Sequence, residues 1–268
     1  MMAVDQIERF DLQILPGGGA ESPTLWWAAS RFMQGARRFH ELQTLLAKTA
    51  SSWTGYPQVG TWDGQTDLEI GELSDEFFNT RPEASALASE AVFHFRAALD
   101  SAVYQLAWRG RGERPSGTMF PFCKTADSWP NRRRSDLRGL TNEEKAAVAD
   151  VQPFRNVAWS ARLAELSNRD KHDHTLEIAS VYSCTVDTTR RMADVPDPRF
   201  TQFAIVDPAL KFVFVPVDRK LDGNDLRIAT DDLIIIMQGI TEFLNPLLEK
   251  EGVSKIELES QLSQAPSA

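Results

Sequence analysis

Two charged residues on one predicted helix have the types and the spacing that chemistry needs. Arg96 and Asp100 are four residues apart, and on a helix both lie beside the apolar stripe rather than opposite it. Charges in that position either pair with each other or face a partner across a groove. An ordinary ion pair of this spacing contributes only about 0.2–0.5 kcal/mol. The sequence leaves both interpretations open.

A second polar group lies in the run Asn168-Arg169-Asp170-Lys171-His172-Asp173-His174. If the helix before this run continues, Asp170 shares the face of Leu163 and Leu166. His172 is suited to general acid or base work near neutral pH, because nearby carboxylates orient a histidine and raise its pKa. The alternative is that Lys171 and His172 only offset the negative end of a helix.

The two groups together define the candidate site. The enzyme hypothesis places five residues around one groove, with His172 as the acid or base and Lys171 or Arg96 holding a phosphate or an anionic intermediate; they are Arg96, Asp100, Asp170, Lys171 and His172. In the alternative hypothesis the same residues form a buried polar network that joins two helices and does no chemistry. Under it, Asp170 or His172 reaches Arg96 or Asp100.

The motifs of several common sites are absent from the sequence. It has no phosphate-binding P-loop, no dinucleotide fingerprint, no nucleophile elbow and no HExxH helix. It has two cysteines, Cys123 and Cys184, and no Cys/His cluster. We therefore expect neither a cofactor nor a metal.

Apolar spacing predicts the elements that must position these residues. Helices are expected at about 26–48, 83–109, 158–172 and 230–250, and a capping box at Thr141 opens a shorter one. The 83–109 helix carries one apolar stripe, which should pack on the Asp-Lys-His helix: Val92, Phe95, Leu99, Val103 and Leu106. A β-hairpin near 56–73 and a small antiparallel sheet from about 178–228 complete a predicted α+β fold.

The chain is expected to form a single domain over 1–268. An irregular arm is expected at 1–24, because Pro16-Gly17-Gly18-Gly19 suits neither helix nor strand. A frayed tail is expected at 252–268. Pro82 is interpreted as lying in the first turn of its helix.

The formal net charge of −9 argues against a general binder of phosphate backbones. One local exception is Asn131-Arg132-Arg133-Arg134 with Arg138, interpreted as a solvated loop. Few cysteines, no signal peptide and no long apolar run predict a cytoplasmic protein without a membrane partner. RNA and a second copy of the chain remain open as partners.

Several short motifs resemble a widespread group of uncharacterised bacterial proteins. The helix His94-Phe95-Arg96-Ala97-Ala98-Leu99-Asp100 is similar to their N-L-R-S-A-L-D helix. The matches continue in the same order with Phe120-Pro121, then Gln152-Pro153-Phe154, then Leu163, Leu166 and Asp170-Lys171-His172. The resemblance covers about residues 84–176, and the group has no assigned activity.

Two positions depart from the pattern of that group. It usually has Asn at His94 and Arg at Asp173, so a site that needs that arginine is altered here. A second resemblance is to the HEPN superfamily of helical proteins, many of which are metal-independent RNases with an Arg-x(4–6)-His motif. Arg169 and His174 fit that spacing, although Arg169 points away from His174 on an ideal helix. This resemblance implies an RNase or a toxin or defence protein. The alternative is a non-catalytic binding or interaction protein.

Overall fold

The structure of the protein is a computed structural model. It describes the backbone of residues 23–52, 59–62, 75–172, 176–191, 201–214, 229–252 and 255–256. It describes the side chains of residues 23–50, 80–168, 176–178, 212, 214, 229–252 and 255–256. Most of the predicted N-terminal arm and C-terminal tail lies outside these ranges.

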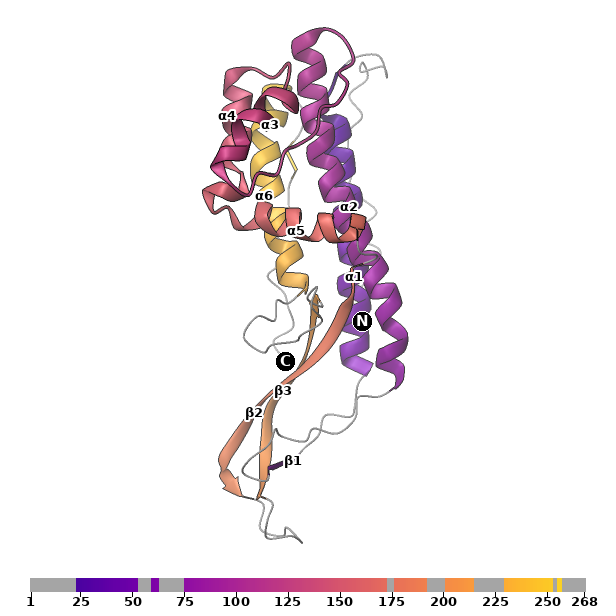
Figure 1. Cartoon of the computed structure of the whole chain (residues 1–268). Helices are drawn as coiled ribbons and strands as arrows, with labels where there is room; N and C mark the ends of the chain where they lie inside the picture. Colours follow the sequence, from indigo (N-terminus) through magenta and orange to yellow (C-terminus); the bar gives the residue numbers. More distant parts are fainter. Residues whose placement is uncertain are drawn as a thin grey trace. The chain divides into compact units, whose positions relative to one another are not determined.

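The chain separates into two compact units. The first consists of Met1–Met33, His94–Ala161 and Ile236–Ala268, and the second of Gln34–Phe93 and Arg162–Ile235. Four helices, labelled in Figure 1, each contribute residues to both units: α1 (Trp26–Ser52), α2 (Asp75–Arg111), α5 (Ala158–His172) and α6 (Ala229–Lys250). The single domain expected over 1–268 stays a prediction.

The predicted long helices are all present. The α-helices of the described chain are α1 (Trp26–Ser52), α2 (Asp75–Arg111), α3 (Trp129–Ser135), α4 (Asn142–Asp150), α5 (Ala158–His172) and α6 (Ala229–Lys250). Short 3-10 turns occur at Ala126–Ser128 and Pro153–Arg155. Helix α4 opens with the predicted capping box, because the Thr141 hydroxyl accepts from the Glu144 amide while the Glu144 carboxylate accepts from the Thr141 amide.

Two local predictions about helices are wrong. Pro82 lies inside α2, and not in its first turn. The turns around it are held from outside, since the Thr80 and Thr49 hydroxyls lie 3.4 Å apart and Arg81 forms an ion pair with Glu177. The arginine run around Arg133 is helix α3, and not a loop.

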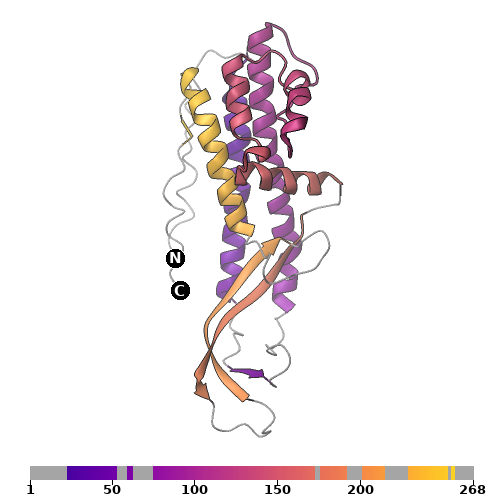
Figure 2. The same cartoon turned by 60° about the vertical axis from the view of Figure 1, so that its left-hand side comes forward.

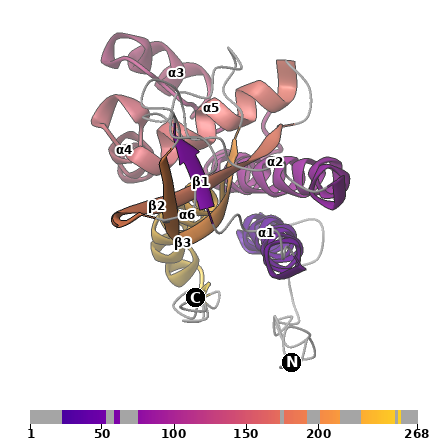
Figure 3. The same cartoon turned by 90° about the horizontal axis from the view of Figure 1, so that it is seen from below.

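The second unit contains a helix pair and a sheet. The later part of α1 and the early part of α2 lie side by side (Figure 2), with Arg38 bonded to Glu90 at 2.7 Å. Strands β2 (Ile178–Arg191) and β3 (Thr201–Phe214) pair antiparallel, with Ile178 opposite Phe214. The short β1 (Val59–Trp62) pairs antiparallel with the other edge of β3 (Figure 3).

The sheet only partly tests the sequence prediction. Strand β1 pairs with β3, and the hairpin expected at 56–73, which would also pair β1 with the segment after Asp63-Gly64, stays a prediction. Residues 63–74 lie outside the described part. Within the region 178–228, where a small sheet was expected, residues 201–214 form one strand, β3, and its register with β2 shifts around Pro208. Proline cannot donate to the ladder, so it produces an irregularity there.

The predicted α+β class is wrong. About 76% of the residues whose side chains are described are helical, and no continuous strand lies among them. The strand residues described as buried are Ile178, Phe212 and Phe214. The packed core of the described chain is therefore mainly helical. The β-branched runs predicted strands in the backbone, but they did not predict the fold class.

The apolar stripe of α2 is buried as expected. Val92, Phe95, Leu99, Val103 and Leu106 are each at most 1% exposed. Leu163 and Leu166 of α5 are also buried. The packing of α2 directly against α5 stays a prediction.

Candidate functional site

Arg96 and Asp100 face each other on adjacent turns of α2. Arg96 Nε donates to Asp100 Oδ2 at 3.0 Å, and Arg96 Nη2 donates to Asp100 Oδ1 at 3.1 Å. The Arg96 side chain is 12% exposed and that of Asp100 is 35% exposed. The interpretation that the two charges pair is confirmed. The geometry is bidentate, which is the arrangement that a guanidinium and a carboxylate favour.

The same pair forms hydrogen bonds with the backbone of Phe120. Arg96 Nη2 donates to the Phe120 carbonyl at 2.7 Å, and the Phe120 amide donates to Asp100 Oδ1 at 2.8 Å. The guanidinium carbon of Arg96 also lies 4.5 Å from the centre of the Phe122 ring. Three of the five N–H donors of Arg96 are therefore used within the protein. We call Arg96, Asp100 and the Phe120 backbone the Phe120 latch.

A second polar side chain holds the residues that follow the latch. The fully buried Gln152 accepts from the Cys123 amide at 2.9 Å and donates to the Val148 carbonyl at 3.0 Å. The Cys123 carbonyl accepts from the Phe154 amide at 3.1 Å. Buried backbone groups need such partners, because leaving one unpaired costs about 1–3 kcal/mol.

Three of the motifs on which the predicted resemblance rests therefore lie together in one unit. The Arg96–Asp100 step, the Phe120-Pro121 dipeptide and the Gln152-Pro153-Phe154 turn are joined by these hydrogen bonds. Pro121 has no backbone N–H that needs a hydrogen-bond partner. This suits a segment that is held by hydrogen bonds to Phe120 and Cys123. The sequence identified these residues but did not reveal that their common function in the fold is to fix residues 120–123.

The other half of the predicted site lies outside the described side chains. The backbone of α5 continues to His172, so Asp170, Lys171 and His172 are helical as expected. Their side chains, that of Arg169, and residues 173–175 are outside the described part. The groove that would bring these residues together with Arg96 and Asp100 stays a prediction. His94, at which the bacterial group usually has Asn, is half-buried.

Sequence reasoning missed a charged network in the same unit. Arg109, near the end of α2, pairs with Glu144 of α4 and with Glu251 just beyond α6, each at 2.5 Å. Glu251 also accepts from the Leu25 amide at 3.0 Å, just before α1. The Glu144 capping box was the only sequence signal here, because the other contacts join residues far apart in the chain.

A shallow groove of about 310 Å³ lies between α4 and α6. Its lining is mostly apolar, with glutamates and a lysine among the surrounding residues: Glu143, Glu144, Ala147, Val151, Glu242, Phe243, Pro246, Leu247 and Lys250. Lys250 donates to Glu143 at 2.5 Å, and this hydrogen bond and the lysine's charge lower the pKa of the Glu143 carboxyl. The groove contains no histidine or cysteine.

The described chain offers no group of three or more His, Cys, Asp or Glu side chains that could hold a metal. None of the helices in the described residues has the length and apolar character needed to cross a membrane. Comparisons with protein-family models, with curated proteins and with solved structures found no match.

Proposed function

We propose that this chain is a non-catalytic binding protein in which Arg96 and Asp100 are structural. The observation that carries the proposal is the Phe120 latch, where both residues bond to the amide and the carbonyl of the same residue. A catalytic arginine must present donors to a substrate, and Arg96 is only 12% exposed. Its positive charge is also already neutralised by the ion pair with Asp100.

The competing hypothesis is a HEPN-like, metal-independent RNase in which His172 acts as acid or base. It requires Arg96 or Lys171 to stabilise an anion beside that histidine. The bonds of Arg96 to Asp100 and Phe120 count against this use of the arginine. The two hypotheses also differ in what a substitution at Arg96 should do to stability.

The test compares RNA cleavage with stability in the same variants. We expect the wild-type protein to leave RNA intact, and Arg96→Ala to lower the free energy of unfolding by about 1–3 kcal/mol in urea titration, because the Phe120 carbonyl and Asp100 lose their donor. Arg114→Ala is the matched control, since this arginine is exposed and stacks on Trp108 without an ion pair in the described chain. The proposal fails if the wild type cleaves RNA, His172→Ala and Arg96→Ala abolish cleavage, and both variants keep wild-type stability.

A further inference from the structure

Most described arginines of this acidic chain have a carboxylate partner. Eight form ion pairs with Asp or Glu: Arg37, Arg38, Arg81, Arg96, Arg109, Arg111, Arg132 and Arg162. With an excess of acidic residues and a net charge of −9, such pairing is expected. An arginine left without an acid is therefore the exception that needs a reason.

Four of the exceptions gather around α3. Arg133, Arg134, Arg138 and Arg155 are exposed, and no described carboxylate pairs with any of them. Among the described residues, Arg133 donates to the neutral Asn142 amide oxygen, at 3.5 Å. Residues 124–138 hold five basic and two acidic side chains, a net charge of +3. One of the acids, Asp136, is buried and bonded to Arg132 and Ser135, so it neutralises Arg132 and does not pair with Arg133, Arg134 or Arg138.

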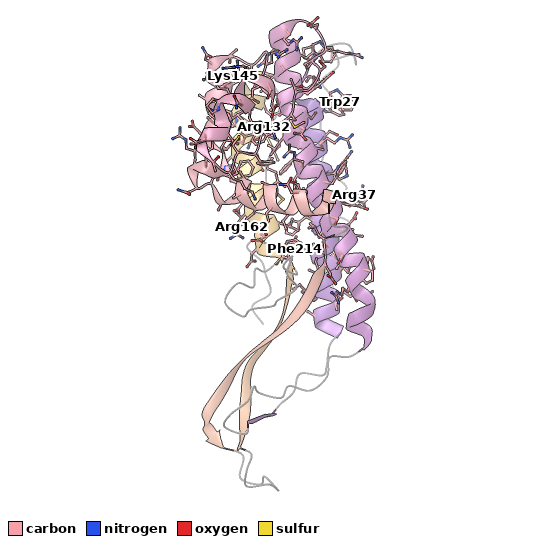
Figure 4. All side chains as sticks on the ribbon, viewed as in Figure 1. Trp27, Arg37, Arg132, Lys145, Arg162 and Phe214 are labelled. Atoms are coloured by element: carbon pink, nitrogen blue, oxygen red, sulfur yellow. The ribbon has the colours of Figure 1, made fainter. Side chains whose placement is uncertain are left out.

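The arginines are presented on ordered structure. Arg132, which Figure 4 labels on α3, bonds to Asp136 at 3.2 Å across one helical turn. Pro130 lies in the first turn of α3, where its fixed backbone angle favours a helix. From the sequence, residues 131–138 were interpreted as a solvated loop. Such a loop would not hold these charges in a fixed arrangement.

Aromatic rings lie beside the charges. Trp129, the first residue of α3, has its ring centre 6.0 Å from that of Phe154. The guanidinium of Arg155 lies 5.7 Å from the Phe154 ring centre. Both rings are half-buried, so each keeps part of its surface open to solvent. We call Arg133, Arg134, Arg138, Arg155, Trp129 and Phe154 the α3 basic surface.

We infer that the α3 basic surface binds single-stranded nucleic acid. Guanidinium groups hold phosphates with paired hydrogen bonds, and aromatic rings stack on unpaired bases without regard to sequence. An acidic peptide would use the arginines but gain little from the rings. The inference rests on the proposed function in one respect, namely that the strand is bound and not cut.

Binding is measured by fluorescence anisotropy on the full chain. The probes are end-labelled oligo-U and oligo-dT of about 12 nucleotides, a length within the range of single-strand sites. We expect binding that weakens as salt rises, with a slope of log K against log salt near −0.7 for each phosphate contacted. Arg133→Gln/Arg134→Gln should lower affinity roughly tenfold at about 50 mM salt and reduce the slope by about 1.4.

The matched control carries the same charge change elsewhere. Arg37→Gln/Arg114→Gln removes two exposed arginines that lie outside the α3 basic surface, one of them labelled in Figure 4. It should bind like the wild type. Circular dichroism of both double variants checks that each remains folded, which is expected because the four side chains are on the surface.

Each outcome separates the two proposals. No binding, equal loss in both double variants, or equally effective competition by polyglutamate overturns the inference and leaves the Phe120 latch untouched. A denaturing gel of the bound oligonucleotide reports cleavage. Binding that depends on Arg133 and Arg134 but is followed by cleavage keeps the basic surface and overturns the non-catalytic function.

Discussion

At the scale of single residues, side chains that could serve a catalytic site instead hold the backbone in place. Arg96, Asp100 and Gln152 each have hydrogen-bonding groups that a catalytic site could use. In the structure they form hydrogen bonds with the backbone of Phe120, Cys123 and Val148. Residue type and spacing therefore identified the Arg96–Asp100 pair. They did not reveal its structural role, because that role depends on hydrogen bonds to Phe120, twenty residues after Asp100.

Glu41 provides a residue-scale prediction about pH. Burial by itself raises the pKa of this carboxyl, but hydrogen bonds and charge from Arg38 and Arg37 outweigh burial and hold the pKa below its ordinary value of 4.5. A lowered carboxyl pKa stabilises the fold above pH 4.5, and this contribution is lost as the pH falls through the lowered value. The stabilisation is present at neutral pH.

We expect Glu41→Gln to lower the free energy of unfolding at neutral pH by up to about 1 kcal/mol, because these side chains are partly exposed. The difference from wild type should vanish in strong acid, where Glu41 is protonated in both states. Urea titrations at several pH values measure it. A constant difference across the whole pH range would show that the ion pairs are not its source.

At the scale of elements, helix periodicity located the long helices because each has one buried face. It could not show where helices approach closely, since that depends on residues distant in sequence. Gly239 of α6 is such a place, because a Cβ atom added there would lie 2.1 Å from the Trp159 ring. The absence of a side chain lets the tryptophan pack against the α6 backbone.

Gly239→Ala should therefore destabilise the protein. In an open helix position this change stabilises by about 1 kcal/mol, so the expected sign is reversed by packing. We expect a loss of about 1–3 kcal/mol, typical of overpacking. Thermal or urea unfolding of Gly239→Ala in wild-type and Trp159→Ala backgrounds measures the coupling. If the substitution has the same effect in both backgrounds, the close approach does not govern it.

The strands show the limit of pattern reading at this scale. β-branched residues between Ile178 and Val217 predicted strands, and backbone pairing is present in β2 and β3. The inferred fold class was nevertheless wrong, because class depends on how much of the core each element supplies. Alternation of residue types does not report that quantity, and the described core is helical.

At the scale of the whole molecule, net charge concealed a local exception. A net charge of −9 predicts a poor binder of phosphate backbones, yet four exposed arginines that no described carboxylate pairs with lie around α3. Composition sums over the whole chain and discards position. The candidate residues Asp170, Lys171 and His172 lie on α5 as predicted, and whether they meet Arg96 stays a prediction.

The structural role of Arg96 and Asp100 depends on one hydrogen bond more than on any other. The Phe120 amide donates to Asp100 Oδ1 at 2.8 Å, so the latch should protect that amide from exchange with solvent. The Glu144 amide, bonded to Thr141, is an internal reference in the same unit. Hydrogen exchange followed residue by residue by NMR measures both amides in one sample.

In wild-type protein we expect the Phe120 amide to be protected, and in Asp100→Ala to exchange about tenfold faster or more while the Glu144 amide is unchanged. Rapid exchange of the Phe120 amide in the wild type, or the same protection in Asp100→Ala, would contradict the latch and return Arg96 and Asp100 to the list of candidate catalytic residues.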